Sequence, residues 1–142
     1  MKREDLIAQL HPQLQPLAIT HAQRAEAAGI SIVFTAGFRS PAEQEALFEK
    51  GRTLANGVWV TTDPHGIVTN ATPDHAPHCR RAAYDLVPIV NEKAAWDRLD
   101  LFAQLGAIGK SLGLVWGGDW PKLKDMPHFE LAGWRLLPLP LA

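Results

Sequence analysis

A long irregular segment near the middle of the chain constrains the fold more than any other part of the sequence. Residues 51–80 are dense in Gly, Pro, Asn, Asp and Thr and keep neither a helical nor a strand period. We expect a long ordered loop here, with one short strand around Ile67 and Val68. A loop of this length inside a small domain is usually functional or disordered.

The N-terminal flank is predicted to be mainly helical. A second helix is expected over residues 17–28, followed by a buried, β-branched strand at residues 30–34. The run Ser40–Glu43 then combines an N-cap serine, a proline at the first helical position and a glutamate three residues after the cap, which is a capping box. A first helix is indicated by four leucine and isoleucine residues on one face, interrupted at Pro12: Leu6, Ile7, Leu10 and Leu14.

The C-terminal flank alternates strands with one strong helix. Strands are expected at residues 82–88, 114–116 and 128–131, and the tail from residue 133 is expected to pack along the domain surface. An amphipathic helix is marked by apolar residues at helical spacing, namely Leu101, Phe102, Leu105, Ile108 and Leu112. The sequence therefore predicts an α+β fold, a small, mostly antiparallel sheet with N-terminal helices and one long packed helix.

Length, charge and cysteine content exclude several classes of protein. The 142 residues fit a single domain, 1–142. Fourteen Lys and Arg residues against fifteen Asp and Glu residues give a net charge of −1, which provides no basis for clamping nucleic acid or an anionic membrane. The single cysteine, Cys79, excludes an intrachain disulfide and an all-cysteine zinc site. The first ten residues lack the apolar run of a secretory signal, so we expect synthesis in the cytoplasm.

Two histidine–carboxylate pairs and one arginine stand apart as candidates for chemistry. His78 ends the irregular segment and Asp85 lies seven residues later in a predicted strand, a pair that suits Zn²⁺. Asp125 precedes His128 by three residues in a turn shaped by proline, so that one can bind a metal while the other faces its water. Arg39, in the turn before the capped helix, is placed to hold an oxyanion.

Each of these residues also has an ordinary structural explanation. Asp85 inside an apolar strand needs some partner, whatever its role. Arg39 can satisfy loop carbonyls, and His128 with Glu130 can be an exposed polar pair on one strand face. The combined pattern is more specific than any single residue.

Five runs of sequence resemble, in order, the zinc peptidases of the D-Ala-D-Ala carboxypeptidase/hedgehog fold. They are GFRSPAEQEALFEKGRT, VTNA, HCRRAAYDLV, GLVWGGDW and DMPHFEL, and the resemblance as a whole covers roughly residues 30–131. The similarity is strongest to the branch of L-alanyl-D-glutamate peptidases, many of them phage endolysins. The first family motif, Ser-x-His-x-x-Gly-x-Ala-x-Asp, is matched at three positions and departs at Ala76 and Arg81, where the family has Ser and Gly.

The resemblance implies a role for each matching residue. One Zn²⁺ per chain would be held by His78, Asp85 and His128. Asp125 would be the catalytic base and Arg39 would bind the scissile carbonyl. Ser40 and Gln44, which also match the family, are expected to contact substrate. Apart from the resemblance, Trp120 is expected to form a wall of the substrate cleft and Asp119 to support a ligand histidine. His75 is an imidazole that the family pattern does not require, and it is expected to support the metal ligands or to compete with them as a ligand. Cys79, next to a ligand, is a further conceivable thiolate ligand.

The implied activity is hydrolysis of the peptidoglycan stem peptide by a metal-activated water, at the L-Ala–D-Glu bond. The alternatives are a D,D-carboxypeptidase or dipeptidase acting on D-Ala-D-Ala ends, and a noncatalytic zinc-containing module that binds peptidoglycan. The resemblance further implies endolysin-like lysis by a bacteriophage protein. We expect a monomer without a separate cell-wall-binding domain, which reaches the wall after a membrane pore forms and inserts into no membrane.

Overall fold

The computed structural model describes residues 1–137, and its centre is a five-stranded antiparallel sheet. Its main path runs β1 (Ser31–Ala36), β4 (Ala83–Val90), β7 (His128–Leu131) and β6 (Leu114–Trp116), and the short β5 (Lys93–Ala94) pairs with β4. Apolar and β-branched residues dominate these segments, which explains why they form strands. The predicted α+β class and the predicted antiparallel sheet are both confirmed.

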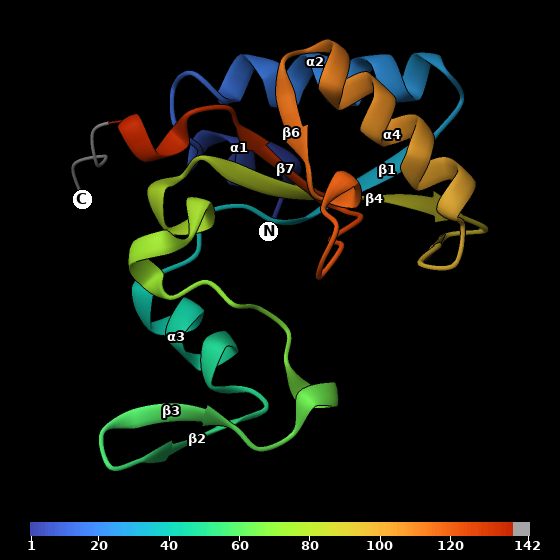
Figure 1. Ribbon diagram of the computed structural model, residues 1–142. Helices are drawn as coiled ribbons and strands as arrows, with labels where there is room; N and C mark the ends of the chain where they lie inside the picture. Colours follow the sequence, from blue (N-terminus) through green and yellow to red (C-terminus); the bar gives the residue numbers. More distant parts are fainter. Residues whose placement is uncertain (138–142) are drawn as a thin grey trace.

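Two helices cover one face of the sheet (Figure 1). They are α2 (Gln15–Ala27) and α4 (Leu99–Ser111), which pack against each other, while α1 (Arg3–Ala8) packs against α2 and β1. Period-two alternation turns Tyr84 and Phe129 from adjacent strands toward these helices, and both side chains are fully buried. The alternate residues of the same strands therefore face the opposite side, away from the helices.

A buried polar pair lies inside this helix–sheet interface. The Tyr84 hydroxyl lies 2.6 Å from His21 Nδ1, and the other nitrogen of His21 lies 2.9 Å from the Leu105 carbonyl oxygen. Since the carbonyl can only accept, Nε2 carries the proton and Tyr84 donates to Nδ1. Burial lowers the pKa of His21 to about 4, against the opposing effect of the Leu105 carbonyl.

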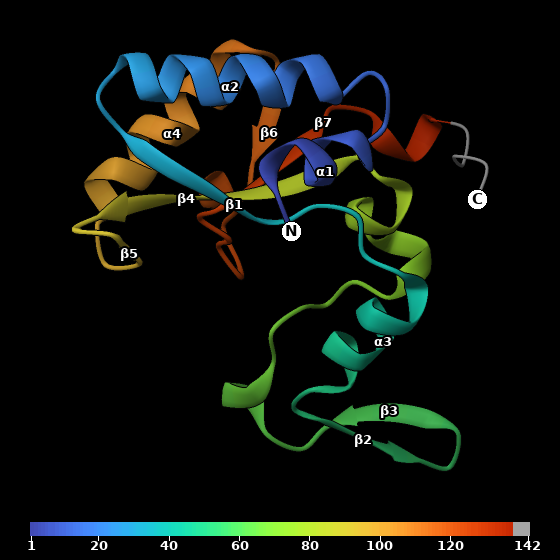
Figure 2. The same ribbon diagram turned by 180° about the vertical axis from the view of Figure 1, so that it is seen from behind.

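The middle of the chain forms an arm that projects from the sheet on the side opposite the helices (Figure 2). The arm consists of α3 (Pro41–Glu49) and a hairpin of β2 (Arg52–Ala55) and β3 (Val58–Thr61). The capping box is present as predicted. The irregular segment predicted over residues 51–80 is confirmed from residue 62 on, where the chain forms loops and short 3-10 turns. It is wrong for residues 52–61, which form the hairpin, and the strand predicted at residues 67–68 is absent. An exposed turn at Asn56 and Gly57, both with positive φ, closes the hairpin.

The segment after β7 forms the 3-10 helix η5 (Trp134–Leu136), which contacts the 3-10 helix η3 (Pro77–Arg80). Trp134 is buried, whereas Leu136 is almost fully exposed, so the predicted surface packing of the tail applies to its first residues, and residues 138–142 lie outside the described part. Over residues 1–137, no helix has both the length and the apolar character needed to cross a membrane.

Candidate active site

The register of β4 and β7 brings three polar side chains to the face opposite the helices. Asp85 pairs directly with His128, and Ala83 pairs with Glu130. Because Tyr84 and Phe129 point toward the helices, Asp85, His128 and Glu130 all point to the other face. The two predicted ligands of these strands are therefore neighbours because of the strand register, which a one-residue slip would destroy.

His78 reaches the same point from a separate segment. It belongs to the 3-10 helix η3 (Pro77–Arg80), and its side chain is 5% exposed. Its Nδ1 lies 2.8 Å from the Gly37 carbonyl oxygen, so Nδ1 carries the proton and donates. The backbone carbonyl of His78 in turn accepts from the Arg39 N–H at 3.2 Å. The loop that carries Arg39 and the turn that carries His78 are thus fixed to each other.

Three potential ligand atoms converge at this point. His78 Nε2 lies 3.2 Å from His128 Nδ1, and Asp85 Oδ1 lies 3.3 Å from the first and 3.6 Å from the second. Ligands about 2.0–2.1 Å from a tetrahedral zinc ion lie about 3.3 Å from one another. The triangle of these three atoms therefore has the size of one face of a zinc coordination tetrahedron.

The hydrogen bonds around the triangle give an independent reason to place a cation there. The outer nitrogen of His78 donates to the Gly37 carbonyl, and the outer nitrogen of His128 lies 2.8 Å from the Glu130 carboxylate. In neutral rings the inner nitrogens then carry lone pairs that face each other and Asp85 Oδ1. This buried carboxylate oxygen has no hydrogen-bond partner among the described residues. Three facing electron pairs repel unless a proton or a metal ion lies between them.

The electrostatics of the site agree with this geometry. Burial would raise the pKa of Asp85, but the two adjacent histidines hold it well below its usual range. Burial would lower the pKa of His128, but the carboxylates around it, Asp85 and Glu130 above all, raise it to about 9. The site as a whole therefore favours positive charge at its centre.

Asp125 lies beside this triangle and leaves room for a further group. Its Oδ2 is 3.8 Å from His128 Nδ1, and its side chain is 44% exposed. Burial of part of the group raises the pKa of the Asp125 carboxyl, and the charge of Asp85 raises it further. The Asp125 N–H donates to the Gly117 carbonyl, and its own carbonyl accepts from the His128 N–H. A carboxylate held by its backbone at the open side of the ligands has the position of a general base.

Arg39 is fixed by a buried glutamine. Its Nη1 donates to Gln44 Oε1 at 2.9 Å, and Gln44 Nε2 donates to the Ala71 carbonyl at 2.9 Å. Gln44 is 1% exposed, so both ends of its amide are used within the protein. Gln44 also lines the cavity, so its predicted contact with substrate stays a prediction beside its contact with Arg39.

Ser40 is the N-cap of α3. Its Oγ accepts from the Glu43 N–H, as the capping box predicts. The substrate contact expected of Ser40 stays a prediction beside this capping role.

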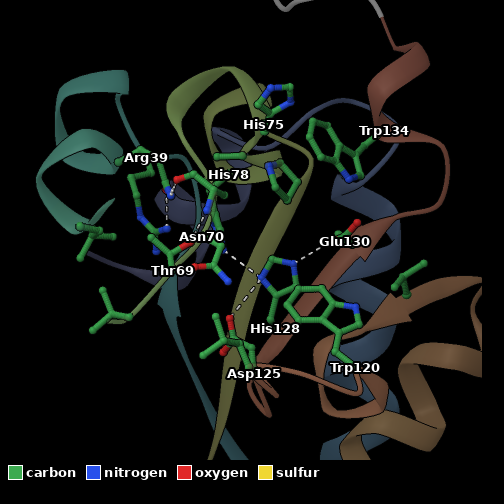
Figure 3. A pocket seen from close by; sticks show the side chains of 18 of the residues that line it. Arg39, Thr69, Asn70, His75, His78, Trp120, Asp125, His128, Glu130 and Trp134 are labelled. Carbon is green, nitrogen blue, oxygen red and sulfur yellow. Dashed lines mark hydrogen bonds and ion pairs between the residues drawn. The ribbon is translucent and has the colours of Figure 1, made fainter. Parts of the chain in front are cut away.

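A cavity of about 990 Å³ opens over the ligand triangle (Figure 3). It lies between the sheet, the root of the arm and the loop before β7. Trp120 forms one wall, with its ring centroid 5.0 Å from that of His128, as predicted for a cleft residue. His75 lines the cavity beyond His78, on the side away from His128. Four cationic side chains line the same cavity: Arg39, Lys122, Lys124 and Arg135.

The carboxylate that supports a ligand histidine is a different residue from the one predicted. Asp119 forms a surface ion pair with Lys110 at 3.0 Å, so the prediction that it supports a metal ligand is wrong. Glu130 makes that contact, from two positions after His128 on the same strand face. The alternation of His128 and Glu130 was visible in the sequence, but only the burial of β7 shows that the pair is not exposed.

Within residues 1–137, the group that could hold a metal ion consists of His78, Asp85 and His128. His75 and Cys79 lie outside it, and the Cys79 thiol lies 3.8 Å from the Ser40 carbonyl oxygen. The set of two imidazoles and one carboxylate, with one side open, is the donor set of catalytic zinc sites.

Comparison with known proteins agrees with the geometry of the site. The profile of a peptidase family described as D-alanyl-D-alanine carboxypeptidase matches residues 69–131, which include the ligand triangle and Asp125. The chain is 33% identical over 132 residues to the peptidoglycan L-alanyl-D-glutamate endopeptidase CwlK of Bacillus subtilis, covering 86% of this chain and 73% of that protein. The chain belongs to the D-alanyl-D-alanine carboxypeptidase family. It is therefore a peptidase, and its family confirms the resemblance seen in the sequence.

Solved structures of two further proteins share the fold of this carboxypeptidase-family chain. The L-Ala D-Glu endopeptidase ChiX of Serratia marcescens matches with a TM-score of 0.64 at 22% identity, over 91% of this chain and 85% of that one. The D,D-pentapeptidase VanY of the VanB-type resistance cassette, solved with Zn(II), matches with a TM-score of 0.64 at 16% identity, over 88% and 74%. The donor set of this chain, His78, Asp85 and His128, fits the predicted zinc cofactor.

Proposed function

We propose that this protein is a zinc endopeptidase that cleaves the L-Ala–D-Glu bond of the peptidoglycan stem peptide. The observation that carries the proposal is the ligand triangle, whose edges of 3.2, 3.3 and 3.6 Å fit one face of a zinc tetrahedron. The choice of bond is supported by the 33% identity to CwlK, which is named for that bond. The cationic lining of the cavity suits a stem peptide, which carries free carboxylates.

The residues of the site divide the chemistry between them. His78, Asp85 and His128 would hold the zinc, which when bound supplies a Lewis acid and lowers the pKa of water from about 15.7 toward about 7. Asp125, at the open side, accepts the proton of the attacking water and returns it to the leaving amine. Arg39, held by Gln44, donates to the oxygen of the scissile carbonyl as negative charge develops there. Trp120 walls the cleft and limits access of bulk water to His128.

Mass spectrometry of digested peptidoglycan tests the bond. We expect zinc-loaded protein to release stem peptides that begin at D-Glu. Loss of terminal D-Ala without that product would instead support a D,D-carboxypeptidase and overturn the proposed bond. The absence of any cleavage of peptidoglycans with different stem peptides would support the noncatalytic binding module.

The variant Asp125→Ala tests the proposed base. We expect it to keep one zinc per chain and to lose cleavage by about 10²–10⁴-fold, the usual contribution of general acid–base catalysis. Asp119→Asn is the matched control, because this carboxylate pairs with Lys110 on the surface. Full activity in Asp125→Ala would remove Asp125 from the mechanism.

We extend the proposal to endolysin-like lysis by a monomeric, bacteriophage-encoded protein that reaches the wall after a membrane pore forms. Its support is the sequence resemblance to endolysins. A fall in turbidity of cells with permeabilised outer membranes, together with a monomeric mass by light scattering, is the expected result. Intact cells after addition of the active enzyme would contradict the lytic role.

A further inference from the structure

The two histidines of the ligand triangle are held by chemically different partners. His78 donates from Nδ1 to a backbone carbonyl, a neutral acceptor, whereas His128 Nε2 lies 2.8 Å from the Glu130 carboxylate. We propose that Glu130 is a positioning residue of the metal site: its carboxylate holds His128 with Nε2 protonated and Nδ1 free to bind zinc, and so strengthens zinc binding. This inference rests on the proposed zinc site and deepens it.

The placement of Glu130 leaves little freedom to the imidazole. Both residues lie on β7, two positions apart, and the strand is buried from end to end. Their side chains are 4% and 12% exposed, so water cannot readily replace the carboxylate as the acceptor. With Nε2 committed as a donor, the lone pair of neutral His128 must reside on Nδ1, the atom that faces His78 and Asp85.

The charge of Glu130 is the second part of the argument. Three carboxylates, those of Asp85, Asp125 and Glu130, lie around one imidazole. A buried carboxylate is costly unless it is paired, and adjacent like charges increase that cost. Among the described residues, the ion-pair partner of Glu130 is His128 itself. A divalent cation on the opposite nitrogen of His128 polarises its N–H toward Glu130, which makes a third negative charge at this position favourable.

Zinc affinity measured by competition with a chromophoric chelator tests the proposal. In Glu130→Met, which keeps the length of the side chain but removes the acceptor, we expect zinc affinity to fall about 10–100-fold. Glu130→Gln keeps a neutral acceptor, so its loss is expected to be smaller but at least about threefold. Asp119→Asn is the control, and its affinity should equal that of the wild type, because Asp119 touches no ligand histidine.

Nitrogen-15 NMR of the histidine rings supplies a readout that a purely structural role would not move. In zinc-loaded wild type and Glu130→Gln, we expect His128 to show a protonated Nε2 and a metal-bound Nδ1. In Glu130→Met the Nε2 proton should exchange faster, because no acceptor protects it. If Glu130→Met fails to fold, as judged by circular dichroism, then Glu130→Gln alone decides.

The inference would be overturned if both variants fold and bind zinc with an affinity within threefold of the wild type. If Glu130→Met does not fold, the same result in Glu130→Gln alone would overturn it. This outcome is separate from a failure of the proposed function, because chelator competition requires no peptidase activity. Protein that binds zinc and loses affinity in Glu130→Met, yet cleaves no peptidoglycan, would support the inference and contradict the function. Protein that cleaves the stem peptide, and whose zinc affinity does not change when Glu130 is replaced, would support the proposed function and contradict the inference.

Discussion

Replacement of Gly117 by alanine should displace the proposed catalytic base. A Cβ atom added at Gly117 would collide with the Asp125 backbone carbonyl and would lie 3.0 Å from the Cβ atoms of both Asp125 and His128. Gly117 is not among the residues with positive φ, so alanine brings no backbone strain of that kind. The effect of the substitution is therefore a shift of the segment that carries Asp125.

The size of the expected effect follows from these contacts. The colliding partner is backbone, which cannot rotate away, so the segment must move by about 1 Å to reach ordinary contact distance. A displacement of about 1 Å in an enzyme site can lower the rate about 10²-fold. We expect kcat for stem-peptide cleavage to fall by about that factor, while saturating zinc still gives one ion per chain.

Product release measured by mass spectrometry, with zinc content determined on the same samples, provides the assay. Gly57→Ala is the control, because Gly57 has a φ of +77° and open space around it in the hairpin turn. It should lose about 1 kcal/mol of stability without losing activity. Wild-type kcat in Gly117→Ala would refute the claim that this close approach positions Asp125.

Three further predictions concern stability. The pKa of His21 is lowered to about 4 from the usual 6.5. The contribution of the neutral ring to the free energy of unfolding is therefore complete above pH 6.5 and is lost as the pH falls toward 4, by up to about 3 kcal/mol. The free energy of urea unfolding should depend less on pH in His21→Gln than in the wild type, and an equal pH dependence in the two proteins would contradict this. Arg81 has a φ of +61°, donates to the Gln9 carbonyl at 2.8 Å and stacks 4.0 Å from the centroid of the Phe38 ring. Arg81→Gly should therefore lower stability by about 1 kcal/mol, although it relieves backbone strain. A higher melting temperature in this variant would contradict the prediction. Ser40→Ala should lower stability by about 1 kcal/mol, because the cap of α3 is lost. The KM for the stem peptide should not change, and a raised KM would support the predicted role of Ser40 in substrate binding.

Arg81 also shows what a single departure from a family motif can mean. The family has Gly where this chain has Arg81, and the backbone there is left-handed, the conformation that glycine adopts at least cost. The arginine tolerates it because its guanidinium is anchored to the loop after α1 and to Phe38, next to Arg39. The substitution therefore preserves the turn that follows His78.

Much of the fold could be predicted because local signals coincide with tertiary structure. The capping box at Ser40 and the apolar period of residues 101–112 correspond to α3 and α4. The hairpin at residues 52–61 was missed because it lies away from the core and its apolar residues Leu54, Val58 and Val60 are exposed, so it has no buried face to set an alternation. Its turn at Asn56-Gly57 is a recognisable hairpin signal that could have found it.

The site was predictable in its ligands but less so in the groups around them. His78, Asp85 and His128 stand in motifs with fixed spacing, and the strand register brings the latter two together. The roles of Gln44 and Glu130 depend on which side chains are buried, and residue spacing alone does not carry that information. Asp119 was assigned by its closeness in sequence to Trp120, whereas the structure turns it toward Lys110.

X-ray absorption spectroscopy of the zinc-loaded protein tests the central claim most directly. The account predicts one zinc per chain with two imidazole nitrogens, one carboxylate oxygen and one exchangeable light-atom ligand, and loss of that zinc in His78→Ala. A sulfur ligand from Cys79, a third imidazole, or wild-type zinc retained in His78→Ala would contradict it.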